Sequence, residues 1–124
     1  MRAAQTPDYP DHLPTRPGKP RANKYGAKRT AYTNYAQVTR TYDSKKEAEY
    51  AASLDMLRRA GHISYWLPQV RIALPGGVSY VADFFIMHAD GTVQWIDVKG
   101  RDTPLSASKR KIVRAIYGID VEIV

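Results

Sequence analysis

Two aspartates and one lysine carry charge within apolar stretches of the 124-residue sequence. Asp97 and Lys99 are two positions apart near the end of the segment 92–99, so on a β-strand their side chains share one face. Asp83 interrupts the apolar and aromatic segment 80–86. A charge in such surroundings is costly unless it has a partner or a function. These three residues are therefore the first candidates for chemistry.

The spacing around Asp90-Gly91 brings the two aspartates together. An Asp-Gly pair between extended segments predicts a two-residue hairpin turn. Asp83 lies seven residues before Asp90 and Asp97 six residues after Gly91, which places both at about the same level on adjacent strands. Neighbouring carboxylates repel each other, and a divalent cation with oxygen ligands is the usual remedy. The alternative is a structural ion pair in which Lys99 neutralises one aspartate.

A third carboxylate is expected from the segment 43–60, which has the period and the ends of a helix. Asp43 or Ser44 can cap this helix, and Ser44 and Glu47 have the spacing of a capping box. Glu47 shares the more apolar stripe of the helix, whereas Glu49 points to the opposite side. Glu47 is therefore the preferred candidate ligand, although a capping role alone also explains a glutamate at this position.

The elements that must position these residues alternate between helix and strand. Gly61 ends the first helix, and Thr103-Pro104 has the sequence of an N-cap and first residue of a second helix, which Gly118 ends. Extended segments are predicted at residues 63–67, 70–74, 78–88, 92–99 and 119–123. This order predicts an α/β or α+β domain in which a mixed central β-sheet is flanked by α-helices.

The basic charge is concentrated in the first third of the chain. The net charge is +7; residues 1–40 hold 8 basic and 2 acidic residues, and residues 41–124 hold 11 and 10. Prolines in the first twenty residues favour an extended chain, and basic residues then alternate with tyrosines. We expect residues 1–40 to form an extended basic N-terminal arm that binds nucleic acid, and residues 41–124 to form a single domain. The alternatives are a solubilising tail or an arm that its tyrosines fix to the domain.

Composition excludes several classes of protein. The sequence has no cysteine, which excludes disulfide frameworks, thiolate zinc sites and cysteine nucleophiles and fits a reducing cytoplasm. The longest apolar run, residues 84–87, is far shorter than the roughly 18 residues that indicate a membrane span. We therefore expect no membrane partner.

The candidate residues resemble the PD-(D/E)xK nuclease superfamily. The matching residues are Glu47 on the first helix, Asp83 on a strand, and Asp97 and Lys99 on the next strand. More narrowly, the chain from residue 23 onward is similar to small phage-encoded members, in the blocks 23–28, 42–50, 80–84, 97–100 and 117–119. Ala82 stands where the name-giving proline would be, and that proline carries no chemistry.

The resemblance implies a restriction-endonuclease-like core of the kind found in Holliday-junction-resolvase-like endonucleases, and metal-assisted hydrolysis of DNA. Glu47, Asp83 and Asp97 would hold Mg²⁺ or Mn²⁺, and Lys99 would orient or deprotonate the attacking water. Gln69 is an auxiliary candidate because relatives often carry a polar site residue in the strand before the first aspartate. A solvent-facing glutamine is the alternative.

Basic residues of the arm and of both helices are the candidates for binding the DNA backbone. They are Lys24, Lys28, Arg29, Lys45, Lys46, Lys109, Arg110 and Lys111. For the last three, a solvated basic face of the second helix is the alternative.

The expected function is a Mg²⁺-dependent endodeoxyribonuclease in phage DNA processing, recombination or packaging, acting in the cytoplasm of a bacterial host. Symmetric cutting of two strands would favour a homodimer. Two alternatives stay open. One is a nucleic-acid-binding protein that keeps a nuclease fold without catalysis, and the other is a phage assembly or interaction protein.

Overall fold

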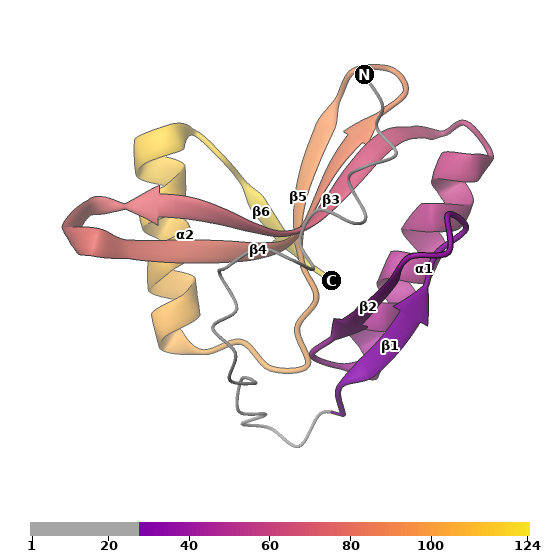
Figure 1. Cartoon of the computed structure of the whole chain (residues 1–124). Helices are drawn as coiled ribbons and strands as arrows, with labels where there is room; N and C mark the ends of the chain where they lie inside the picture. Colours follow the sequence, from indigo (N-terminus) through magenta and orange to yellow (C-terminus); the bar gives the residue numbers. More distant parts are fainter. Residues whose placement is uncertain (1–27) are drawn as a thin grey trace.

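The computed structural model describes residues 28–124, in which helices and strands follow the predicted order from the first helix onward. A mixed four-stranded sheet and two helices form the main body, and a two-stranded hairpin precedes them in the chain (Figure 1). The predicted fold class, a mixed central sheet flanked by helices, is confirmed.

Both helices begin and end where short sequence signals place them. Helix α1 (Lys45–Arg59) is capped by Ser44, whose side chain accepts a hydrogen bond from a backbone N–H of the first turn. Helix α2 (Pro104–Tyr117) is capped in the same way by Thr103. Gly118 ends α2 with a φ of 71°, a left-handed conformation that glycine adopts without strain.

The main sheet has the strand order β3-β4-β5-β6. Strands β3 (Ile63–Leu74), β4 (Val78–His88) and β5 (Val93–Asp97) are antiparallel neighbours, and β6 (Val121–Ile123) is parallel to β5. A parallel pair needs a crossover connection, and α2 provides it. The sheet therefore places the end of β5 next to the last residues of the chain.

Strand β3 is continuous, whereas the sequence predicted two shorter extended segments in its place. Pro68 cannot donate to the ladder, yet the pairs Pro68–Phe84 and Val70–Ala82 keep the same register. Gln69, between these pairs, has a positive φ of 53°. A positive φ is uncommon for a residue with a side chain, so the strand carries local strain at Gln69.

The β4–β5 hairpin closes through three residues, so the predicted two-residue turn is wrong. A backbone hydrogen bond of 2.8 Å joins the His88 N–H to the Thr92 carbonyl, and residues 89–91 lie between them. Asp83 and Asp97 are each seven residues from the middle of this turn. The longer turn therefore makes their positions symmetric, and the prediction that they lie at the same level is confirmed.

The N-terminal hairpin consists of β1 (Thr30–Thr33) and β2 (Thr39–Tyr42), which are antiparallel and contact α1. Tyr42 is 4% exposed and joins the apolar core. The folded unit therefore includes residues from 30 onward, whereas the sequence placed everything up to residue 40 in the arm. Residues 1–27 of the expected arm, with Lys24, lie outside the described residues.

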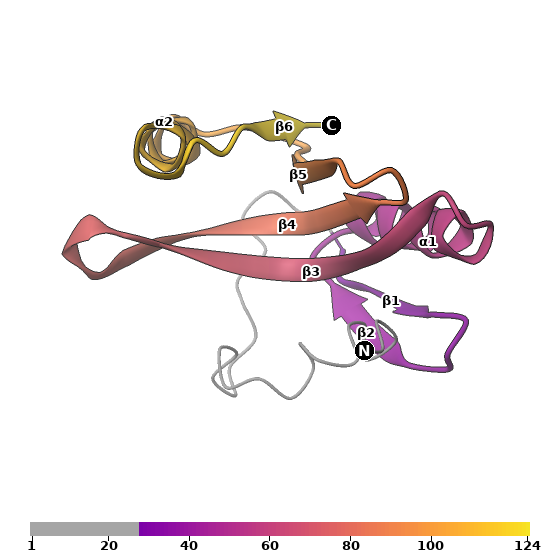
Figure 2. The same ribbon diagram turned by 90° about the horizontal axis from the view of Figure 1, so that it is seen from above.

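Two apolar clusters lie toward opposite ends of the long β3–β4 hairpin (Figures 1 and 2). The first packs α1 and β2 against the sheet around Phe84, and the second packs α2 against the sheet around Val113. Ala82 belongs to the second cluster and Phe84 to the first, so Asp83 lies between the two cores on β4. Neither α1 nor α2 combines the length and the apolar character that crossing a bilayer requires.

Candidate functional site

Asp83 and Asp97 are fixed by hydrogen bonds to each other's strands. The Asp83 backbone N–H donates to Asp97 Oδ1 at 3.0 Å, and the Val98 N–H donates to Asp83 Oδ2 at 2.8 Å. These bonds continue the β4–β5 pairing beyond its last backbone pair, Phe84–Ile96. The two aspartates are therefore adjacent, and each holds the other's strand in place.

Asp97 is a buried carboxylate with one oxygen left without a hydrogen bond. It is 1% exposed, its Oδ2 has no hydrogen-bond partner, and Lys99 Nζ lies 3.4 Å from that oxygen. Burial raises the pKa of Asp97, and the positive charges of Lys99 and Arg110 oppose this rise. A buried oxygen without a hydrogen bond is costly to the fold, and a ligand at this oxygen would compete with the Lys99 ion pair.

Glu47 reaches the same place from α1 through Gln69. The Gln69 Nε2 donates to Glu47 Oε2 at 2.7 Å and to Asp83 Oδ1 at 3.3 Å. Glu47 is 4% exposed, whereas Glu49 lies on the exposed face of the helix, as the helical period predicts. The alternative of a purely solvent-facing Gln69 is therefore wrong. Its amide joins two carboxylates, and its strained backbone lies at the site itself.

Lys99 is positioned by the last residue of the chain. The Lys99 N–H donates to the Val124 carbonyl at 3.2 Å, and the Val124 N–H donates to the Asp97 carbonyl at 2.9 Å. Lys46 Nζ donates to the Lys99 and Val124 carbonyls at 3.2 and 3.1 Å. Lys46, which the sequence predicts to bind DNA, thus has its ammonium group on two backbone carbonyls of the protein.

Arg110 enters the site from α2 with its guanidinium held by two side chains. Its Nη1 donates to Asp102 Oδ1 at 3.0 Å and to Ser106 Oγ at 3.1 Å, and its Nη2 donates to Asp102 Oδ2 at 2.6 Å. This two-point contact raises the pKa of Arg110 and lowers the pKa of Asp102. Arg110 is thus held at the site, unlike a solvated arginine on an exposed helix face.

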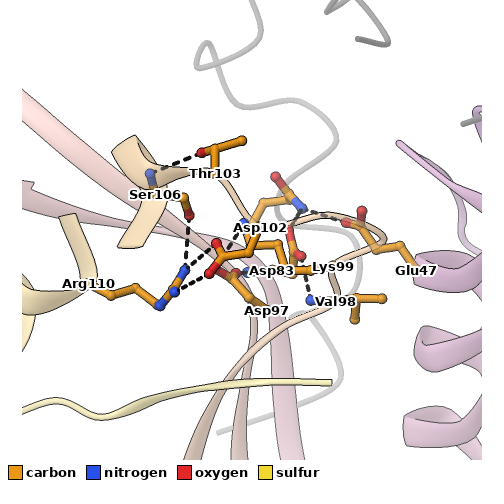
Figure 3. Close-up of polar contacts among 10 residues, drawn as sticks. Glu47, Asp83, Asp97, Val98, Lys99, Asp102, Thr103, Ser106 and Arg110 are labelled. Atoms are coloured by element: carbon orange, nitrogen blue, oxygen red, sulfur yellow. Dashed lines mark hydrogen bonds and ion pairs between the residues drawn. The ribbon is translucent and has the colours of Figure 1, made fainter. Parts of the chain in front are cut away.

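Figure 3 shows how the two helices enclose the site. Glu47 points inward from the α1 side and Arg110 from the α2 side, with Asp83, Asp97 and Lys99 between them. The structure therefore brings together the four residues predicted to be catalytic, the auxiliary Gln69, and one of the predicted DNA-binding residues. Their roles stay predictions.

Sequence reasoning missed two residues of this cluster, Asp102 and Ser106. Ser106 lies four residues before Arg110 on the same helix, a spacing that places the two side chains side by side. This signal could have found it. Asp102 precedes the N-cap Thr103 and lies outside the helix, so no helical period connects it to Arg110.

The other predicted DNA-binding residues are spread over different surfaces. Lys109 Nζ donates to the Ser79 carbonyl at 3.2 Å, and Arg29 Nε lies 3.9 Å from Asp43 Oδ1. Arg29, like Lys28, Lys45, Lys46 and Lys111, is exposed. Because consecutive helical residues point in different directions, residues 109–111 do not form one basic face.

The donor chemistry of the site fits a hard divalent cation, but its present arrangement does not converge on one. Carboxylate oxygens are the ligands that Mg²⁺ prefers, and Asp97 Oδ2 is a buried oxygen free of hydrogen bonds. In residues 28–124, however, no three acidic or histidine side chains are placed to hold a metal ion. Glu47 and Asp83 instead share the Gln69 amide. Metal binding would require these carboxylates to move closer together.

No curated protein and no solved structure matches this chain. A family model described as "Protein of unknown function (DUF1064)" matches residues 22–123. The matched span includes every strand and helix described above and all the residues of the candidate site. The chain therefore belongs to the DUF1064 family.

Proposed function

We propose that this protein is a metal-dependent DNA endonuclease that hydrolyses phosphodiester bonds. The observation that supports this most is that α1, β4 and β5 each direct an acidic side chain toward the same region, beside one lysine (Figure 3). An ion pair with Lys99 would explain Asp97 alone. It does not explain why Glu47, from a separate helix, is buried and joined to Asp83 through Gln69.

In this proposal Glu47, Asp83 and Asp97 would hold Mg²⁺ or Mn²⁺, and the bound ion would supply a water of lowered pKa and neutralise phosphate charge. Asp97 Oδ2 can take a ligand without losing a hydrogen bond of the fold. The Gln69 amide must turn or withdraw, because its Nε2 group now binds both other carboxylates. Lys99 carries the cation that can orient water or stabilise negative charge on a phosphate oxygen.

The proposed substrate is DNA, bound through its backbone by the exposed lysines 28, 45 and 111 and by basic residues of the arm. Symmetric cutting of two strands would need a two-fold dimer. The protein would act on phage DNA in the cytoplasm of a bacterial host.

A DNA-binding protein without catalytic activity is the second candidate. The observation that favours it is the separation of the carboxylates in the described chain, where no three acidic groups meet around one point. In that case Gln69 would hold Glu47 and Asp83 permanently, and the cluster would serve the fold alone.

Nicking of supercoiled plasmid DNA tests the proposal, with full-length protein in Mg²⁺, in Mn²⁺ and in EDTA. Asp97→Asn is the matched variant, because asparagine keeps an oxygen for the Asp83 N–H, while it loses the charge and replaces the second oxygen by an NH₂ group. We expect the wild type to nick DNA only with metal, and the variant not to nick. Binding without nicking would support the second candidate, and neither binding nor nicking would support an interaction protein. Metal-dependent nicking by a folded Asp97→Asn protein would overturn the assigned site.

A further inference from the structure

The guanidinium of Arg110 has one edge free at the candidate site. Arginine carries five N–H donors. Both Nη1 hydrogens go to Asp102 and Ser106, and one Nη2 hydrogen goes to Asp102. The two that remain, on Nε and Nη2, lie parallel along one edge of the plane. Within residues 28–124 no hydrogen bond uses them.

Such an edge matches two oxygens of a phosphate, which arginine binds with parallel N–H bonds. The Arg110 side chain is only 17% exposed, so its position is set by the fold. It also lies close enough to Asp97 for each to affect the other's pKa. Figure 3 shows Arg110 pointing from the α2 side toward Asp97, so a phosphate bound by Arg110 would lie on the α2 side of the same site.

We infer that Asp102 is a positioning residue, which holds Arg110 so that its free edge receives a phosphate of the DNA backbone at the site. This inference rests on the proposed endonuclease function and names a contact for its substrate. Without Asp102, Arg110 keeps its charge but loses two of the three bonds that fix its plane. Charge would then still attract DNA, while the phosphate would be misplaced.

The chain offers a matched control on the same helix. Arg114 Nη1 contacts Asp120 Oδ1 at 2.6 Å, and these two side chains are 72% and 67% exposed. Asp120→Asn therefore removes the same charge from the same kind of pair, away from the carboxylates. Asp102→Glu is the conservative variant, because it keeps a carboxylate for the guanidinium.

Single-turnover cleavage and DNA affinity, measured on full-length protein, test the inference. We expect Asp102→Asn to lower the cleavage rate on the order of 10- to 100-fold, the effect of misplacing a substrate group. Its affinity for DNA in EDTA should be unchanged or higher, because one negative charge is removed. Asp102→Glu should recover much of the rate, and Asp120→Asn should stay close to wild type. Equal rates for Asp102→Asn and Asp120→Asn would overturn the inference, whatever their melting temperatures.

A second measurement keeps the inference separate from the proposed function. With a short DNA duplex in EDTA, the ¹⁵N-labelled Nε–H resonance of Arg110 should shift in the wild type and in Asp120→Asn. The shift should be lost in Asp102→Asn. If the wild type cuts no DNA, the endonuclease proposal fails. The shift of the Arg110 Nε–H resonance then still tests whether Arg110 contacts DNA. An Nε–H resonance that saturating DNA leaves unchanged would overturn the inference in either case.

Discussion

Two buried carboxylates of this protein differ in how their oxygens are used. Asp55 on α1 is 4% exposed, and its Oδ2 accepts hydrogen bonds from the Tyr32 hydroxyl and the Tyr35 N–H, both at 2.9 Å. Asp97 on β5 is 1% exposed, and its Oδ2 accepts no hydrogen bond. The first carboxylate ties the N-terminal hairpin to α1, whereas the second leaves an oxygen for a ligand.

Asp55 and Asp97 are both buried, so burial alone does not mark a functional carboxylate. Native folds satisfy nearly all of their buried polar atoms, so a buried oxygen that accepts no hydrogen bond, and has only an ammonium group 3.4 Å away, needs an explanation. Removing Asp55 should therefore lower stability and spare activity, whereas neutralising Asp97 should abolish activity without lowering stability.

The largest effect on cleavage should come from Glu47, which lies with Asp97 in the candidate site. Glu47→Gln should lower cleavage on the order of 10²- to 10³-fold, because the charge is lost from the site. Stability should change by less than about 1 kcal/mol, since glutamine keeps an oxygen for Gln69 and is accepted at this capping position. Glu49→Gln, on the exposed face, should cut almost as well as wild type. Plasmid nicking and urea unfolding of both variants measure this. Loss of cutting in Glu49→Gln alone would mean that Glu47 serves only the fold.

The next largest effect is expected at Asp55. Asp55→Ala leaves the Tyr32 hydroxyl and the Tyr35 N–H without their acceptor, which should cost about 1–3 kcal/mol. Each kcal/mol lowers the melting temperature of a domain of this size by roughly 4–8 °C. Nicking below the melting temperature should be unaffected. A folded Asp55→Ala protein that no longer cuts would contradict the proposal that Asp55 serves the fold and Asp97 serves activity.

Asp97→Asn should change stability in the opposite direction. Its pKa is raised in the fold, so the charged form of Asp97 is less stable there than in the unfolded chain. That cost is absent below the unfolded pKa, grows as pH rises from the unfolded to the folded pKa, and is complete above the folded pKa. In EDTA, Asp97→Asn should therefore melt above the wild type at neutral pH, and the gain should vanish in acid. Melting curves at several pH values check this, and an equal or lower melting temperature at neutral pH would contradict it.

The smallest effect should come from Tyr32, the partner of Asp55. Burial and the hydrogen bond to Asp55 raise the pKa of Tyr32 from 10.0 to about 12. The stability that neutral Tyr32 contributes is therefore complete below pH 10 and is lost as pH rises toward 12. Tyr32→Phe should lose about 1 kcal/mol at neutral pH and lack this alkaline loss. Urea unfolding between neutral and alkaline pH measures both, and identical pH profiles would show that Tyr32 is not coupled to Asp55.

Features that depend on neighbouring residues could be predicted from the sequence. Ser44 and Thr103 cap the two helices where predicted, because a cap bonds within its own first turn. The helical period distinguished Glu47 from Glu49. The positions of Asp83 and Asp97 followed from one turn, and an error of one residue in that turn left the two aspartates level.

Contacts between side chains from different elements depend on the tertiary fold. It joined Gln69 to Glu47, buried Asp55 under the N-terminal hairpin, and placed Lys46 on the carbonyl of Val124, 78 residues away. The Arg110–Asp102 contact likewise depends on how the loop after β5 turns into α2. Such contacts arise where segments distant in sequence cross. Helical and strand periods predict the direction of a side chain within its own element, but they do not predict which residue of another element it contacts.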